Sequence, residues 1–164
     1  MRRKGASKYP FRRNKTKEQL VAPSEPCDEE KYGTIEDGIW YPNKDFVEDT
    51  HILMLERYGG FTGYERGIDV FDTILEDARK TEDMFRKAAI FLYDICGKRM
   101  FKDGNHRTAI VTTRTFLVKN GMNLGTNDPE KIYKFVKSIA YHSVDDIEKW
   151  IKYGSVEESS VEDP

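Results

Sequence analysis

The stretch Phe101-Lys102-Asp103-Gly104-Asn105-His106-Arg107 is a short polar link between two segments with helical periodicity. Before it, apolar residues recur at helical spacing from Phe85 to Cys96 and stop at Gly97. After it, a helix is expected to begin near Asn105 and to run to Asn120-Gly121. The chain therefore places a loop-to-helix corner between two helices.

This corner has the composition of an anion-binding loop. Gly104 can adopt backbone angles closed to other residues, so that peptide N–H groups converge. The following helix adds its unpaired N–H groups and the positive end of its dipole, and Arg107 adds a forked pair of donors. Asp103 is the natural ligand of a magnesium ion that bridges bound phosphates, and Asn105 is placed to orient an oxygen or to cap the helix. The alternative is an ordinary turn in which Asp103 only caps the helix and Arg107 pairs with a carboxylate.

The segments outside the corner predict an all-α domain, a compact bundle of about six helices over residues 46–154. The other expected helices are Phe46–Tyr58, which ends at Gly59-Gly60, a segment around Ile68–Ala78, one that opens at Asp128-Pro129, and a last one capped by Ser143 and stopped by Gly154.

Residues 32–44 favour a turn or short hairpin before the first core helix, because glycines and a proline surround the patch Ile39-Trp40-Tyr41. This patch either forms a flap that docks a target beside the corner or covers the core. The expected division of the chain is a basic-then-acidic flexible arm (1–31), the helical domain (32–154) and an acidic tail (155–164).

Charge is uneven along the chain although the formal net charge is only -2. Residues 2–17 carry only basic charges, and Glu18 is the first acidic residue. Runs of charge at chain ends are usually solvated tails. Binding of nucleic acid or of an acidic partner through residues 2–17 is the other interpretation.

Two cysteines, Cys27 and Cys96, have no metal-ligand neighbours at useful spacing, and Cys96 falls in an apolar helical pattern. This usage fits a cytoplasmic protein. The sequence has no apolar run long enough for a membrane span, and its basic start lacks the apolar stretch of a secretory signal.

The corner resembles the signature of the Fic/Doc (Fido) family, in which His-Pro-Phe is followed by a variable residue, Asp or Glu, Gly or Ala, Asn, Gly or Lys, and Arg. Five residues match in register: Phe101, Asp103, Gly104, Asn105 and Arg107. Thr108-Ala109 matches the continuation common in Doc-like members. Further likenesses cover about residues 46–125: His51 in the first helix, the glycines at 59, 60 and 63, Lys87-Ala88-Ala89, Phe116-Leu117 and Asn120-Gly121.

This resemblance implies an all-α bundle with the motif between two central helices. It also implies a transferase that moves a nucleotidyl group (Fic) or a phosphoryl group (Doc) from a nucleoside triphosphate to a protein hydroxyl. By resemblance, Asp103 holds Mg²⁺, whereas Gly104, Asn105 and Arg107 hold the phosphates of ATP or another nucleoside triphosphate. A protein substrate or an antitoxin-like regulator is the implied partner, since the inhibitory helix signature of some Fic proteins is absent from the sequence.

Two positions depart from the family pattern. Arg99 occupies the place of the motif His, which is the general base, and Met100 occupies the place of the Pro. A guanidinium remains protonated and accepts no proton at neutral pH, and general-base help is worth ~10²–10⁴ in rate. His106 replaces the Gly or Lys and makes the corner Doc-like; it is expected to contact phosphate or face solvent, or else to act as a substitute base.

The sequence therefore predicts a member closest to the death-on-curing (Doc) branch, with catalytic positions Arg99, Asn105 and Arg107 and with transfer impaired by the missing base. The alternatives are a catalytically silent Fido domain that binds a nucleotide or protein partner, and a nucleic-acid or regulatory adaptor that uses the basic arm.

Overall fold

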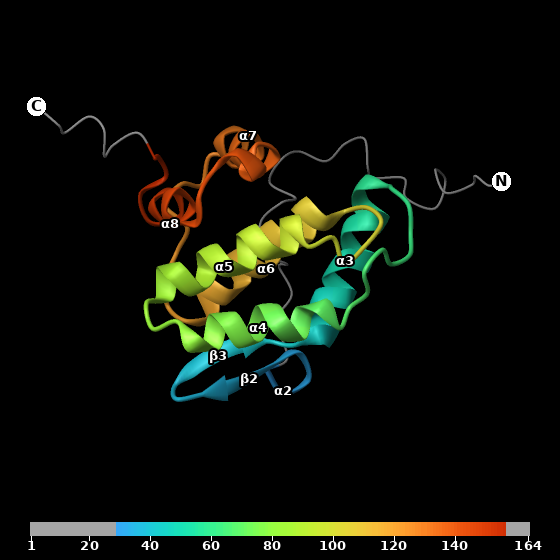
Figure 1. Cartoon of the computed structure of the whole chain (residues 1–164), viewed down its shortest axis with the longest axis horizontal. Helices are drawn as coiled ribbons and strands as arrows, with labels where there is room; N and C mark the ends of the chain where they lie inside the picture. The colour runs from blue at the N-terminus through green and yellow to red at the C-terminus, as the bar shows by residue number, and fades with distance from the viewer. Residues whose placement is uncertain (1–28, 157–164) are drawn as a thin grey trace, which may run out of the picture.

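The computed structural model describes residues 29–156 of the chain (Figure 1). In order, its elements are α2 (Glu29–Tyr32), β2 (Gly33–Glu36), β3 (Ile39–Pro42), α3 (Lys44–Tyr58), α4 (Val70–Lys80), α5 (Met84–Gly97), α6 (Asn105–Lys119), α7 (Pro129–Lys137), the 3-10 helix η3 (Ile139–Tyr141) and α8 (Val144–Tyr153). The predicted all-α bundle with a hairpin before its first core helix is confirmed. The basic run 2–17 and most of the expected arm and tail lie outside the described residues.

Local capping residues set most helix boundaries. Asn43 and Asp83 accept backbone N–H bonds at the starts of α3 and α5. Asp128 accepts the N–H of Glu130 and precedes a proline at the start of α7. Ser143 caps α8 in the same way, through the N–H of Asp146. These interactions satisfy N–H groups that have no partner inside the helix, so the predicted caps at Asp128 and Ser143 are confirmed.

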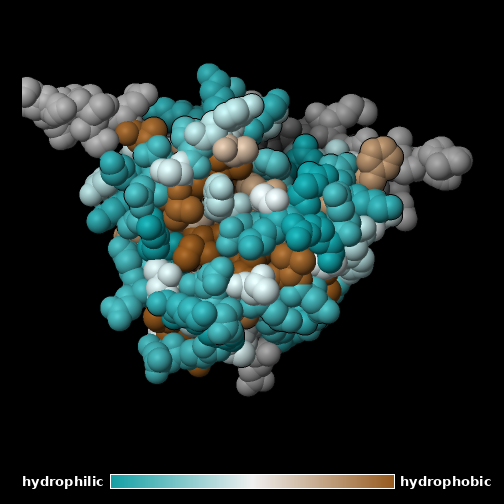
Figure 2. Space-filling view, viewed as in Figure 1, coloured by the Kyte–Doolittle hydropathy of each residue, from teal (hydrophilic) through white to brown (hydrophobic). Residues whose placement is uncertain are grey.

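Helix α5 forms the centre of the core and packs against α4, α6 and α8. Its Phe91 is fully buried, with ring centroids 6.1 Å from Phe71 of α4 and 5.1 Å from Phe116 of α6. Cys96 is also buried there, as predicted, and burial raises the pKa of its thiol to about 12. Hydrophilic residues cover most of the face shown in Figure 2, with apolar side chains visible between them near its centre.

The hairpin of β2 and β3 is antiparallel and covers the end of the bundle where α6 finishes. Its Trp40 and Tyr41 are buried, and the side chain of Asn120 bonds both the N–H and the carbonyl of Trp40, at 2.9 and 3.0 Å. The interpretation of this patch as a flap beside the corner is wrong, because the corner lies at the opposite end of α6. Fifteen helical residues separate the two ends, or roughly 22 Å.

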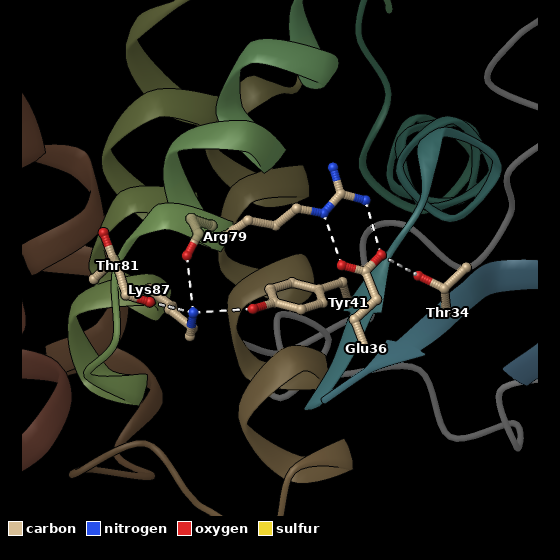
Figure 3. A network of polar contacts seen from close by, with 7 residues as sticks. Thr34, Glu36, Tyr41, Arg79, Thr81 and Lys87 are labelled. Carbon is tan, nitrogen blue, oxygen red and sulfur yellow. Dashed lines mark hydrogen bonds and ion pairs between the residues drawn. The ribbon is translucent and has the colours of Figure 1, made fainter. Parts of the chain in front are cut away.

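A buried lysine fastens the hairpin to the helices (Figure 3). Lys87 of α5 is 2% exposed, and its ammonium donates to the Tyr41 hydroxyl at 2.9 Å and to the carbonyls of Ala78 and Thr81. Nearby, Arg79 of α4 bonds both carboxylate oxygens of Glu36 at 2.9 and 3.0 Å. Lys87, the first residue of the Lys87-Ala88-Ala89 sequence that resembles the family, therefore has a structural role.

Candidate functional site

The α5–α6 loop, residues 98–104, is shaped by a buried amide. Asn105 is 4% exposed, and its side chain accepts the N–H of Phe101 at 3.1 Å and donates to the carbonyl of the same residue at 2.8 Å. Gly104, which directly precedes Asn105, has φ +80, a left-handed conformation that favours glycine. The amide of Asn105 thus closes the loop just before α6 begins. Its contact with phosphate remains a prediction.

A second loop, residues 59–69 between α3 and α4, is paired with the first. Glu65 donates its N–H to the carbonyl of Met100 at 2.9 Å, and Lys102 donates to Gly63 at 3.0 Å. The glycines of this loop are evident from the sequence, whereas its pairing with the α5–α6 loop is not. Its glycine content was the available signal, since glycines allow close approach of two backbones.

Asp103 connects the two loops. One carboxylate oxygen accepts the N–H of Phe61 at 3.0 Å and the other accepts the N–H of Gly104 at 2.9 Å. A Cβ at Gly60 would lie 2.7 Å from the same carboxylate. Asp103 therefore positions the second loop against the first, a role that its predicted metal binding did not include.

His51 of α3 packs against the α5–α6 loop. Its ring stacks on that of Phe101 with centroids 3.7 Å apart and planes 5° apart, and its Nε2 lies 2.8 Å from the carbonyl oxygen of Asp103. Burial lowers the pKa of this histidine. The neutral ring with its proton on Nε2 donates to that carbonyl, so His51 holds the loop in place.

A cavity of about 340 Å³ lies between the start of α6 and helix α7. One side is formed by Asp103–Arg107 and Ile110, and the other by Tyr133, Val136 and Lys137. Gly104, the residue that precedes α6, has no side chain that could accept the N–H groups of the first helical turn. The structure thus brings together five of the six predicted site residues, around a helix terminus that favours anions.

Arg107 extends along this cavity over the ring of Tyr58, with its guanidinium carbon 4.4 Å from the ring centroid. Within residues 29–156, no carboxylate forms an ion pair with it. Burial raises the pKa of Tyr58 to about 12, so its hydroxyl stays neutral. The expectation that Arg107 might simply pair with a carboxylate is wrong for the described residues, and its charge is available to a ligand.

His106 lines the same cavity and is exposed. Partial desolvation, and then the charge of Arg99, lower the pKa of its imidazole. The neutral ring is therefore favoured at neutral pH, which suits either a hydrogen bond to phosphate or the acceptance of a proton.

Arg99 lies beside the cavity and is not among the residues that line it. It adopts φ +51, and its guanidinium bonds Glu65 at 3.1 and 3.3 Å. Arg99 is therefore engaged with the α3–α4 loop. Met100, at the motif proline position, is fully buried.

Arg114 and His142 lie apart from the site. Arg114, seven residues after Arg107 on α6, is half-buried, donates to Asn127 at 3.3 Å and does not line the cavity. His142 stacks on Phe135 with ring centroids 4.6 Å apart. Neither residue adds to the cavity.

The donors of the site fit Mg²⁺ only together with phosphate. Among residues 29–156, no three His, Cys, Asp or Glu side chains gather as a metal site. Each carboxylate oxygen of Asp103 accepts one N–H bond and keeps a further lone pair. Magnesium commonly takes one or two protein carboxylates and completes its shell with phosphates and water.

Comparisons with known proteins agree with this geometry. The model of the Fic/DOC family matches residues 41–117, a segment that includes both loops and most of α6. Comparisons with curated proteins and with solved structures return no match. Among residues 29–156, no helix has the length and apolar character needed to cross a membrane. Over residues 41–117 the chain is therefore similar to the Fic/DOC family.

Proposed function

We propose that this protein is a Doc-like transferase that binds a nucleoside triphosphate in the α6–α7 cavity and has little transfer activity of its own. The observation that carries this proposal is Arg107, which has no carboxylate partner among residues 29–156 and shares a cavity with Asp103 and the amino end of α6. Phosphates bound with Mg²⁺ require a carboxylate to hold the metal, and a cation and helical N–H groups to contact the phosphate oxygens.

The residues take separate roles in this proposal. Arg107, His106 and the start of α6 hold phosphate oxygens, and Gly104 lets the backbone come close. Asp103 holds the magnesium ion, which neutralises phosphate charge. Asn105 acts mainly by fixing the loop through Phe101.

Transfer requires an acceptor hydroxyl to attack phosphorus while the bond to the leaving phosphate breaks, and the hydroxyl proton needs an acceptor. The guanidinium of Arg99 has no lone pair to accept a proton and is bonded to Glu65, so it supplies none. We therefore expect transfer to be slower by ~10²–10⁴ than with a base at this position. The acceptor would be a cytoplasmic protein, with restraint supplied by a separate regulator.

A silent nucleotide-binding domain is the second candidate, and the Arg99–Glu65 ion pair is the observation that favours it. This exposed ion pair engages the side chain at the position of the base in a contact between the two loops. In that case the protein would signal its nucleotide state to a partner without transferring anything.

Replacement of Arg99 by histidine distinguishes the two candidates. Position 99 has positive φ, and histidine is among the residues enriched there, so Arg99→His is compatible with the backbone. We expect the variant to transfer label from ATP or GTP labelled at the α or γ phosphate to proteins of a cell extract at least 10²-fold faster than wild type.

The control is Arg99→Gln, which removes the charge without adding a base. Gain of transfer in Arg99→His alone supports an intact but base-deficient transferase. If Arg99→His binds MgATP yet transfers nothing, the transferase proposal fails and the silent domain is favoured. If neither wild type nor variant binds ATP or GTP, both candidates fail.

A further inference from the structure

Helix α7 supplies the wall of the cavity that faces the loop and α6. Tyr133, Val136 and Lys137 line it, and all three follow the segment 41–117 that matches the family model. These side chains therefore belong to a helix outside the matched segment, and their roles cannot be inferred from the motif residues.

Lys137 brings a second positive charge to the cavity. Its ammonium lies 3.4 Å from the hydroxyl of Tyr133 and 5.4 Å from the centroid of the same ring. No carboxylate within residues 29–156 forms an ion pair with Lys137. Arg107 and Lys137 therefore border one cavity from two helices, and neither charge is neutralised by a described acidic side chain.

The same wall is partly apolar and aromatic. Val136 and, across the cavity, Ile110 are buried, whereas Tyr133 is 43% exposed. A free polyphosphate gains nothing from such a surface, but a nucleobase stacks on an aromatic ring and buries its faces against aliphatic groups. The cavity thus combines two cations with one aromatic and two aliphatic side chains.

We propose that α7 makes this a nucleotide site, with Lys137 as a second phosphate contact opposite Arg107 and Tyr133 as the stacking surface for the base. This inference rests on the proposed function, because it assumes that phosphates occupy the amino end of α6. It adds that recognition of the nucleoside depends on a helix outside the matched motif segment.

Titration calorimetry of the full chain with MgATP, MgGTP and magnesium tripolyphosphate tests the proposal. We expect Lys137→Ala to weaken binding of all three ligands roughly tenfold through loss of a charge-assisted contact. Tyr133→Ala should weaken only the two nucleotides, also roughly tenfold, and Tyr133→Phe should restore their binding. Lys134→Ala, an exposed lysine of the same helix outside the cavity, should leave all three unchanged.

The possible results distinguish the role of α7 from the proposed function itself. If Arg107→Ala abolishes binding but Lys137→Ala and Tyr133→Ala do not weaken it, the role of α7 is overturned and the phosphate site stands. Equal losses for nucleotides and tripolyphosphate in Tyr133→Ala would overturn the stacking role. If wild type binds none of the three ligands, the proposed function itself fails.

Discussion

His51 shows how a single side chain can determine the shape of a site without facing a ligand. It stacks on Phe101 and lies within hydrogen-bond distance of the Asp103 carbonyl, so it fixes the loop residue that is expected to hold magnesium. Its environment lowers the pKa and favours the neutral ring, because burial outweighs the hydrogen bond to the Asp103 carbonyl and the attraction of the Asp103 and Glu48 charges.

The lowered pKa of His51 predicts a loss of stability in mild acid. The unfolded chain takes up a proton near pH ~6.5, whereas the folded ring resists protonation to lower pH. The free energy of unfolding should therefore be highest above pH ~6.5 and decrease as pH falls below it toward the folded pKa. His51→Gln should lose ~1–2 kcal/mol at pH 7.5 through lost stacking and show a weaker decrease between pH 6.5 and 5.

Urea unfolding of both proteins at several pH values measures this difference. Carboxylates titrate in both, so their contribution largely cancels in the comparison. Equal pH dependence in wild type and His51→Gln would show that His51 is not the titrating group.

At the scale of elements, the site is a junction of two loops with the start of one helix. The α3–α4 loop bonds the α5–α6 loop through backbone groups, and Asp103 adds a side-chain link to Phe61. Gly104 is a crowded position in this junction, since a Cβ there would lie 3.3 Å from Cδ2 of His51.

Gly104→Ala should therefore destabilise the protein more than the same change at a roomy glycine with the same backbone angle. Gly121, with φ +81 and no atom within 4 Å of a built Cβ, is the matched control for Gly104 at φ +80. Both changes incur the left-handed penalty of ~1–2 kcal/mol, and only Gly104→Ala also displaces His51. We expect only Gly104→Ala to weaken MgATP binding.

Urea midpoints and calorimetry with MgATP give both quantities. Equal destabilisation by Gly104→Ala and Gly121→Ala, with equal nucleotide affinity, would mean that contact with His51 has no effect on the site.

At the scale of the whole molecule, the two ends of α6 have different tasks. The amino end borders the cavity, and the carboxy end holds the hairpin through Asn120. Lys87 and Arg79 add to the hairpin's attachment at that far end (Figure 3). A substitution at the carboxy end should therefore lower the stability of the fold without changing nucleotide affinity.

Lys87→Met should reduce the free energy of unfolding by about 2–4 kcal/mol, because it leaves the buried carbonyls of Ala78 and Thr81 and the Tyr41 hydroxyl without their donor. Arg79→Ala should lose less than ~1 kcal/mol, since its pair with Glu36 is substantially exposed. Nucleotide affinity below the melting temperature should be unchanged in both.

Chemical denaturation and calorimetry on these two variants test the separation. A fall in nucleotide affinity in Arg79→Ala, the milder variant, would show that the hairpin end and the cavity are coupled after all.

The sequence by itself determined the elements, because their boundaries depend on residues within a few positions of one another. Asp128-Pro129, Ser143 and the corner at Gly104 start helices where predicted, since capping and left-handed turns are local interactions. The Fic/DOC family model matches residues 41–117, which include the corner.

Only the tertiary structure decided which distant segments meet at the site. Pairing of the α3–α4 loop with the α5–α6 loop, the support of His51 and the placement of Lys137 all join residues far apart in the chain. The hairpin packs at the far end of α6 because Asn120 and Lys87 lie there, although its sequence position suggested a flap. Such contacts follow from the packing of helices around α5, which no short stretch of sequence encodes.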